Sequence, residues 1–316
     1  MALFPYFKRA SEPGLLATRL TGGELTYTHL RRLGEDRPVV TLCGLRVLPD
    51  DGEPLNRWAR ETGASRFRCS TLLNQGDYRL LGVDAPPVPA DELKNAVRWK
   101  IKDMVDFRVE DAAVDVLGIP EPSDSAARPK RLLAVAARGD MVQSCMARWR
   151  RAKVPLCIID IPELAQRNVA ALLEEGGRGL AVLSFSQAGG LLTFTLRGEL
   201  CLARHIDVSW AQLQRADAEH RPKLFERIAL ELQRSLDHFD RQFQALPLSR
   251  LVLAPQPEDI GLQGFLADNL YLPVTELDLR EILAFERAAL DGLTPAVQAA
   301  CFLALGAALR LDEERT

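Results

Sequence analysis

The chain has 316 residues, of which 47% are hydrophobic and 26% charged, and its 40 basic and 43 acidic side chains give a net charge of −3. This composition fits a globular protein of one or two domains and excludes wholesale disorder, collagen and coiled coil. The near balance of charge predicts no domain-wide surface for nucleic acid.

The positions of the cysteines, histidines and apolar stretches exclude further classes of protein. The six cysteines lie far apart with no C-x-x-C pair and the four histidines are scattered, so no zinc site is expected and buried thiols in a reducing cytosol are favoured. The longest apolar stretch, 299–309, is shorter than the roughly 20 residues of a membrane span. Residues 1–13 lack the order of a signal peptide. We therefore expect a cytoplasmic protein, with any membrane association made through partners.

The first block of predicted elements opens with a hairpin and contains a small α/β unit. Strands are expected at 14–20 and 25–30 around the glycine pair at 22–23, then a strand at 39–47 and a helix at 53–63. A ββαββα unit over 66–152 is expected next. It comprises a hairpin of strands 67–73 and 78–83, a helix at 91–105, a strand at 114–119, a mobile polar loop at 121–130, a strand at 131–137 and a helix at 140–151.

The second block repeats the plan of hairpins followed by helices. It begins with a strand at 156–161 and a helix at 162–175. The remaining elements are strands at 180–185, 191–196 and 199–206, a helical stretch at 210–243 with a break near Pro222, a strand at 251–254, a helix at 260–270, a strand at 274–277 and a helix at 294–311. The two similar blocks suggest a duplicated architecture.

Common catalytic motifs are absent. The chain holds no P-loop, no G-x-G-x-x-G, no G-x-S-x-G elbow, no H-E-x-x-H and no EF-hand loop. Ser184 and Ser186 end a strand with no base marked beside them, and His205 is interpreted as a packed or surface side chain. The sequence therefore assigns no catalytic residue and no metal ligand.

Several stretches in register resemble the MshI family of MSHA-pilus biogenesis proteins, which is similar to PilM, the actin-like cytoplasmic protein of type IV pilus machines. The stretches are LNQGDY at 73–78, VPADELKNAVRWKIKD at 88–103, VDV at 114–116, IIDIPELAQRN at 158–168, ELQRSLD at 231–237 and GAALR at 306–310. The resemblance covers nearly the whole chain and is weakest before residue 66.

The resemblance implies an α/β protein with the actin-like ATPase fold, in which two large subdomains flank a nucleotide cleft. The implied halves are 1–160 and 161–316, with a small inserted subdomain at 66–152. The ββαββα unit predicted from the residues alone agrees with this insert.

The three nucleotide-binding elements of that fold are degenerate in this chain. Actin-like ATPases hold phosphate and metal with two Asp-x-Gly hairpin loops, and a Gly-Gly turn lies against the adenosine. In the first loop the aspartate position falls on Thr18 or Arg19; in the second, Ser184 replaces aspartate and Ser186 replaces glycine; the adenosine turn has Pro255 and no glycine. A hydroxyl cannot replace a carboxylate around Mg²⁺, and proline removes a backbone donor. We therefore expect no ATP hydrolysis and no cofactor. Weak metal-free nucleotide binding with Arg19 facing phosphate stays open, as does a solvated Arg19.

The resemblance also implies a partner. In PilM-like proteins a groove beside the small subdomain receives the cytoplasmic N-terminal tail of a PilN-like inner-membrane protein. On the predicted helix 91–105, Trp99 lies opposite the apolar stripe at 93, 97, 101 and 104, so it is a candidate interface anchor, with Arg98 and Lys102 beside it. The alternatives are that Trp99 packs within the chain and that the cations face solvent. Asp160 is expected to act in helix entry or between subdomains.

Three functions follow from these expectations. The favoured one is a non-catalytic cytoplasmic scaffold of a type IV, MSHA-like pilus machine, at the inner membrane through its partners. The alternatives are an ATPase that drives the machine and the cytoplasmic platform of type II secretion. Because that platform is usually joined to its own membrane helix and this chain ends at Thr316 without one, the pilus interpretation is expected.

Overall fold

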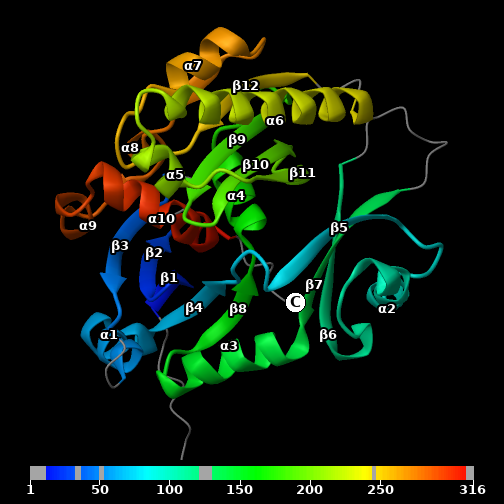
Figure 1. The fold of residues 1–316 in the computed structure, drawn as a ribbon. Helices are drawn as coiled ribbons and strands as arrows, with labels where there is room; N and C mark the ends of the chain where they lie inside the picture. Colours follow the sequence, from blue (N-terminus) through cyan, green and yellow to red (C-terminus); the bar gives the residue numbers. More distant parts are fainter. Residues whose placement is uncertain (1–11, 33–36, 50–52, 121–129, 244–246, 311–316) are drawn as a thin grey trace, which may run out of the picture.

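The computed structural model describes residues 12–32, 37–49, 53–120, 130–243 and 247–310. These residues form two large sheets, each with helices on its outer face, and a third small sheet at one side (Figure 1). The loop predicted as mobile at 121–130 lies outside the described residues except for Lys130. No helix in the described ranges is long and apolar enough to cross a lipid bilayer.

The first sheet is mixed and has six strands in the order β14-β3-β2-β1-β4-β8. Their bounds are β1 (Glu12–Thr21), β2 (Glu24–Arg31), β3 (Val39–Val47), β4 (Phe67–Leu72), β8 (Leu156–Asp160) and β14 (Ala284–Phe285). Alternate residues of β1 face opposite sides, so Leu16 packs toward α1 (Pro54–Thr62) and α3 (Gly139–Arg151), whereas Ala17 packs toward α10 (Pro295–Ala308). The sheet is therefore buried on both faces.

The second sheet has five strands in the order β11-β10-β9-β12-β13. Their bounds are β9 (Gly179–Ser186), β10 (Gly189–Leu196), β11 (Glu199–Ile206), β12 (Leu248–Leu253) and β13 (Val274–Glu276). Helices in this half are α4 (Pro162–Ala170), α5 (Trp210–Arg215), α6 (His220–Gln242), α7 (Leu262–Asn269) and α8 (Leu279–Ile282), whereas α9 (Arg287–Asp291) packs on β3 of the first sheet. The outer face of the sheet packs on α6 through stacked rings of Phe194 and Phe239, whose centroids are 5.0 Å apart.

Helices α4 and α10 cross between the two sheets and hold the halves together. Gly306 makes the close crossing feasible, because a Cβ at this position would lie 2.1 Å from the carbonyl oxygen of Ala165. Asn168 Nδ2 donates to the Gly306 carbonyl at 2.9 Å. Since α10 and β14 pack on the first sheet, the segment from residue 284 onward returns to the first half, and residue 160 does not divide the halves cleanly.

The small sheet has the order β5-β7-β6, with β5 (Tyr78–Asp84), β6 (Ala112–Gly118) and β7 (Arg131–Arg138). One of its faces packs on α2 (Leu93–Lys100) and the other joins the core of the second half. The hairpin predicted from 67–73 and 78–83 is wrong. β4 pairs in parallel with β1 and β8, whereas β5 pairs with β7. The chain turns where the sequence indicates, but its two strands belong to different sheets.

Other predictions are corrected locally. The helix predicted at 91–105 ends at Lys100 and is followed by a short 3₁₀ turn at Lys102–Met104. The break in the stretch 210–243 falls at residues 216–219, ahead of Pro222, which lies in the first turn of α6, where proline is tolerated. The cysteines are free, but they are not uniformly buried, since Cys157 is exposed.

Candidate binding cleft and groove

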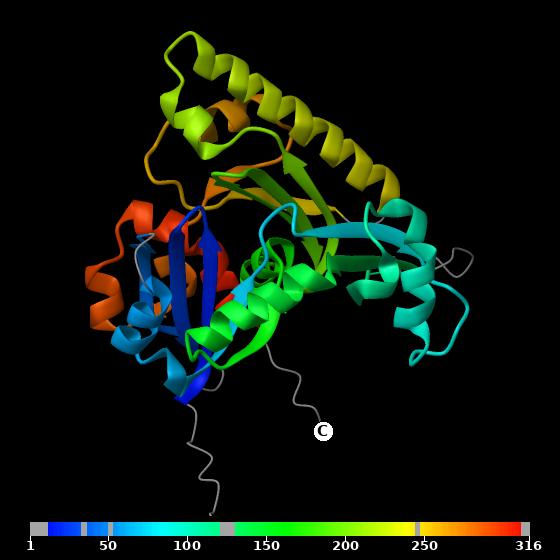
Figure 2. The same cartoon turned by 60° about the horizontal axis from the view of Figure 1, so that its bottom comes forward.

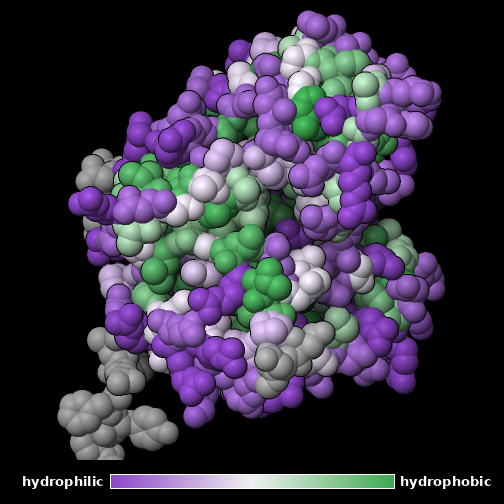
Figure 3. Space-filling model, turned by 60° about the vertical axis from the view of Figure 1, so that its left-hand side comes forward, coloured by the Kyte–Doolittle hydropathy of each residue, from purple (hydrophilic) through white to green (hydrophobic). Residues whose placement is uncertain are grey.

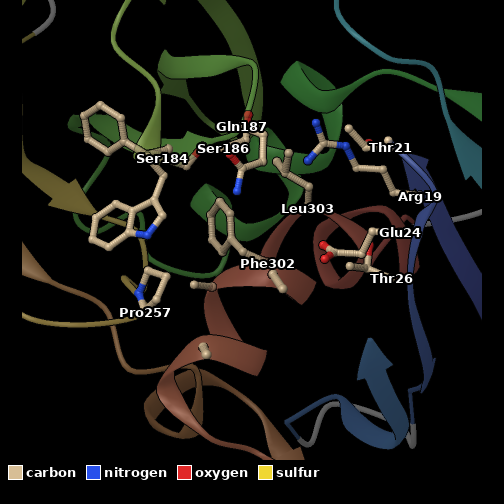
Figure 4. Close-up of a pocket in the computed structure, with 16 residues that line it drawn as sticks. Arg19, Thr21, Glu24, Thr26, Ser184, Ser186, Gln187, Pro257, Phe302 and Leu303 are labelled. Atoms are coloured by element: carbon tan, nitrogen blue, oxygen red, sulfur yellow. The ribbon is translucent and has the colours of Figure 1, made fainter. Parts of the chain in front are cut away.

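A cavity of about 270 Å³ lies between the two halves, where the turns of two hairpins face the first turns of α10. Figure 4 shows the residues around it, and Figure 3 shows hydrophobic residues gathered in the band between the upper and lower halves. The β1–β2 turn is formed by Gly22 and Gly23, whose φ angles of 57° and 79° suit glycine. The lining residues named below are Arg19, Glu24, Ser184, Ser186, Trp210, Pro257, Phe302 and Leu303.

Arg19 is the cation of this cavity. It lies near the end of β1, and its guanidinium reaches into the space between Thr21 and Leu303 (Figure 4). Burial lowers the pKa of Arg19, and the charges of Tyr78 and Glu24 oppose that shift. Its Nε is buried without a hydrogen-bond partner among the described residues. The solvated alternative for Arg19 is therefore wrong, because the side chain lies in the cleft.

Ser184 does not present its hydroxyl to the cavity for ligand chemistry. Its side chain is buried, and its Oγ donates to Oε1 of Gln166 on α4 at 2.6 Å. Gln166 in turn donates to the carbonyls of Val182 and Leu191 and to the hydroxyl of Thr193 at 2.8–3.1 Å. The residue in the expected aspartate position is thus part of a closed internal network.

Ser186 serves the hairpin turn that follows β9. Its Oγ donates to the carbonyl of Gly189 at 3.3 Å and accepts from the backbone N–H of Ala188 at 3.2 Å. Hydrogen bonds of this kind, between a serine side chain and the backbone, stabilise a turn. They do so at a position where the fold would otherwise use glycine, whose backbone adopts turn conformations freely. The hydroxyl therefore has a local structural role.

The cleft does not fit a metal-bound nucleotide. Glu24 is the one carboxylate among the residues that line the cavity, and the described parts of the chain contain no group of three His, Cys, Asp or Glu side chains able to hold a metal ion. Large apolar side chains, Trp210, Phe302 and Leu303, take up the wall instead. Since Mg²⁺ prefers carboxylate oxygens and its own waters, this wall offers a metal–phosphate complex a poor ligand set.

Two predicted cleft residues lie elsewhere. Thr18 is only 1% exposed, and its Oγ1 donates to the carbonyl of Ser70 on β4 at 2.9 Å, because alternate residues of a strand face opposite sides. Pro255 does not line the cavity, whereas Pro257, two residues on, does. Sequence reasoning missed Gln166 and Phe302; each lies in or beside a stretch used for the resemblance, but no motif marks its role.

A buried carboxylate joins three parts of the molecule behind the cleft. Glu163, in the first turn of α4, is 1% exposed; it accepts from the hydroxyl of Tyr78 on β5 at 2.5 Å and lies 3.1 Å from Nε2 of His205 on β11. Burial and the Glu163 charge raise the pKa of Tyr78 far above its ordinary value. His205 is a surface side chain, 39% exposed, that contacts this buried carboxylate, which agrees with its interpretation as a packed or surface residue.

Asp160 ties the end of β8 to the end of α10. Its Oδ1 accepts from the N–H of Ile161 at 2.8 Å, and its Oδ2 pairs with Nη1 of Arg310 at 2.7 Å. The first bond places Asp160 at the entry to α4, as predicted, whereas the ion pair joins β8 to the returning helix within the first half.

A second cavity, of about 530 Å³, lies where the small subdomain meets α3. Its residues come from the 3₁₀ turn at Val109–Asp111 and the residues just before it, the end of β7 and the first turns of α3: Phe107, Arg108, Asp111, Arg138, Gly139, Asp140 and Gln143. Only glycine fits at 139, because a Cβ there would lie 2.1 Å from the carbonyl oxygen of Asp111. Arg138 lowers the pKa of Asp140, to which it is paired.

The predicted partner-binding residues do not line either cavity. On α2, Trp99 is 56% exposed, and Nζ of Lys102 lies 5.8 Å from its ring centroid. The alternative that Trp99 packs within the chain is therefore wrong. Arg98 is half-buried, with its Nε unpartnered among the described residues. These three side chains form a separate outer face of the small subdomain.

Comparison with known proteins agrees with this geometry at the level of the fold. No family model matches the chain, and no curated protein matches its sequence. Among solved structures, the PilM–PilN type IV pilus biogenesis complex matches with a TM-score of 0.72 and 19% identity over 94% of this chain and 99% of that one.

Two further solved structures are more distant. The cytoplasmic domain of EpsL, an inner-membrane component of the type II secretion system of Vibrio cholerae, has a TM-score of 0.49 and 16% identity over 94% of this chain and 96% of that one. A Bacteroides thetaiotaomicron protein with an actin-like ATPase fold has a TM-score of 0.49 and 8% identity over 89% of this chain and 96% of that one.

The chain therefore shares the fold of the PilM structure, which is the actin-like ATPase fold expected from the resemblance, and it carries a small third sheet at one side. This confirms the fold class predicted from the sequence.

Proposed function

We propose that this protein is a non-catalytic cytoplasmic scaffold of a type IV, MSHA-like pilus assembly machine, of the MshI type. It binds the cytoplasmic N-terminal tail of a PilN-like inner-membrane protein, through which it associates with the membrane and with other assembly components. Its nucleotide cleft is degenerate and carries no ATPase activity.

The observation that carries the non-catalytic part of the proposal is the hydrogen bond from Ser184 to Gln166. It closes off the position at which an actin-like ATPase needs a carboxylate. Beside Arg19, Glu24 is the one carboxylate that the cavity wall retains. The residues of this wall can make contacts between the two halves, but they lack the groups for metal-assisted phosphoryl chemistry.

The cavity between the small subdomain and α3 supports the partner-binding part. It lies beside the small sheet at the start of α3, and this position is the reason for proposing it as the groove that receives the tail. Its polar wall of Arg108, Asp111, Arg138 and Asp140 suits the backbone and charged groups of an extended tail. The Trp99 face on α2 is a second, separate predicted anchor that does not line this cavity.

The test is a calorimetric titration of the full chain with a synthetic peptide of that tail, without nucleotide. Arg108→Ala and Arg138→Ala remove exposed cavity cations, with side-chain exposures of 79% and 57%, so the fold is kept. We expect each to weaken binding about 5- to 30-fold, and Trp99→Ala to do the same. Arg131→Ala, at the opposite end of β7, is the matched control and should have no effect. A peptide that does not bind, or that binds all the variants equally, contradicts the proposal.

A further inference from the structure

The lower face of the molecule carries a cluster of cations on two neighbouring helices. Helix α1 and the last turn of α3 lie side by side in both ribbon views (Figures 1 and 2). Their buried faces meet through Trp58 and Trp149, whose ring centroids are 6.2 Å apart. Their exposed faces, with the residues just after α3, carry six cations, called here the α1–α3 basic face: Arg57, Arg60, Arg148, Arg150, Arg151 and Lys153.

These cations have no carboxylate partner among the described residues. Within the described ranges none of the six forms an ion pair, although many other exposed arginines do, such as Arg46 with Glu61 and Arg66 with Glu12. In those two pairs Glu61 of α1 and Glu12 of β1 are already bound to other arginines. A chain with a net charge of −3 thus concentrates unpaired positive charge on one face.

An exposed apolar side chain lies within the same face. Met146 is 44% exposed and precedes Arg150 by four residues in α3, which places these two side chains on the same side of the helix. A methionine among cations suits an interface in which charged headgroups lie beside an apolar layer. A nucleic-acid backbone would offer no such layer to it.

The location of the face agrees with a membrane beside the chain. The cavity with Arg138 and Asp140 is at the first turn of α3, and the cations are at its last turn, so one helix runs from the cavity to the cluster (Figure 2). A second cation cluster, Arg131, Arg204 and Arg241 around His238, lies at the far end of β7 from that cavity. The α1–α3 basic face is therefore the one that a membrane at the cavity would meet.

We propose that the α1–α3 basic face binds the anionic lipid headgroups of a bilayer directly, without the partner protein. The cations contact headgroup phosphates, and Met146 enters the apolar boundary between them. This contact goes beyond recruitment by a partner tail and adds a second, electrostatic attachment to the membrane.

Sedimentation of the full chain with vesicles tests the proposal. Phosphatidylcholine vesicles containing phosphatidylglycerol should bind the chain, pure phosphatidylcholine vesicles should not, and salt of about 0.5 M should release it. Each cation near an anionic surface strengthens binding to the membrane. The triple variant Arg148→Gln, Arg150→Gln and Arg151→Gln should therefore bind these vesicles about 100-fold more weakly. Met146→Ser should also weaken binding.

The matched control removes three exposed arginines from the other cluster, with Arg131→Gln, Arg204→Gln and Arg241→Gln. Its net charge equals that of the test variant, so it should bind vesicles like the parent chain. Equal loss in both variants, no binding to anionic vesicles, or duplex DNA that competes fully for the same arginines would each overturn the proposal. Because the vesicles carry no partner, and the test variant should still bind the tail peptide, the outcome is distinguishable from failure of the proposed scaffold function.

Discussion

Ser184 lies near the end of β9 with its hydroxyl donated to Gln166 Oε1, so an aspartate at this position would meet an acceptor oxygen rather than a cation. Ser184→Asp should therefore destabilise the chain by about 1–3 kcal/mol, since a buried charge would lack a partner. It should not restore magnesium–ATP binding. Urea unfolding measures the first effect and calorimetry the second.

The control for this change is Ser184→Ala, which removes the hydrogen bond without adding charge and should cost about 1 kcal/mol. An aspartate variant as stable as the parent chain, with a new magnesium-dependent affinity for ATP, would contradict this account of the cleft.

His29 makes stability depend on pH. Its ring is 2% exposed, its Nδ1 lies 2.6 Å from the Thr41 hydroxyl, and burial lowers its pKa below the ordinary 6.5. Below that ordinary value the unfolded chain takes up a proton that the folded chain refuses, so the stabilisation is present above it and is lost as the pH falls toward the folded pKa.

We therefore expect the free energy of unfolding to fall between about pH 7 and pH 5, with a slope of at most about 1.4 kcal/mol per pH unit from this group. His29→Asn should reduce the slope, as urea unfolding at several pH values would reveal. Identical slopes in the two proteins would exclude His29 as the cause.

Side-chain direction was harder to predict than residue type. The turn that the sequence assigned to the first cleft loop borders the cavity, but Thr18 and Arg19 were left as alternatives, because a shift of one residue reverses every side chain of a strand. In the structure Arg19 lines the cleft, whereas Thr18 donates a hydrogen bond to the Ser70 carbonyl. Gln166 could not be found from the sequence, since its role depends on four partners on β9 and β10.

The crossing of α4 and α10 depends on one small residue. Gly306→Ala would place a Cβ 2.1 Å from the Ala165 carbonyl oxygen, so the helices must separate. The change should destabilise the chain by about 1–3 kcal/mol or more, as overpacking does, and thermal or urea unfolding measures it.

Gly264→Ala on α7 is the matched control, because no atom lies within 4 Å of the added Cβ. It should stabilise the chain by about 0.5–1 kcal/mol through helix propensity. If both substitutions changed the free energy of unfolding in the same direction, the close crossing of the helices would not be the reason for glycine at 306.

Local elements were predictable where their signals are local. The hairpin of β1 and β2 follows from its glycine pair, and the strand pair β9–β10 from two apolar runs around a short turn. The pairing of β4 was wrong because parallel partners such as β1 and β8 lie far away in sequence and leave no turn signal between them. The resemblance supplied the overall architecture that the local patterns could not.

At the scale of the whole molecule, Glu163 joins the small subdomain, α4 and the second sheet through Tyr78 and His205. Glu163→Gln should cost about 1.5–3 kcal/mol, since hydrogen bonds to a charged group are the stronger kind. Hydrogen exchange should rise in both β5 and β11.

A double-mutant cycle with Tyr78→Phe checks this link. Because the two groups share one hydrogen bond, their effects should be non-additive by at least about 0.5 kcal/mol. Fully additive effects, or exchange that rises in only one of the two strands, would mean that the carboxylate does not connect the subdomains.

The central claim is that the protein acts by binding and not by ATP hydrolysis, and calorimetric titration of the full chain with ATP and Mg²⁺ tests it most directly. We expect no magnesium-dependent heat of binding and no phosphate release above background. Tight binding that requires Mg²⁺, accompanied by phosphate release that Arg19→Ala abolishes, would contradict the account and establish the cleft as an ATPase site.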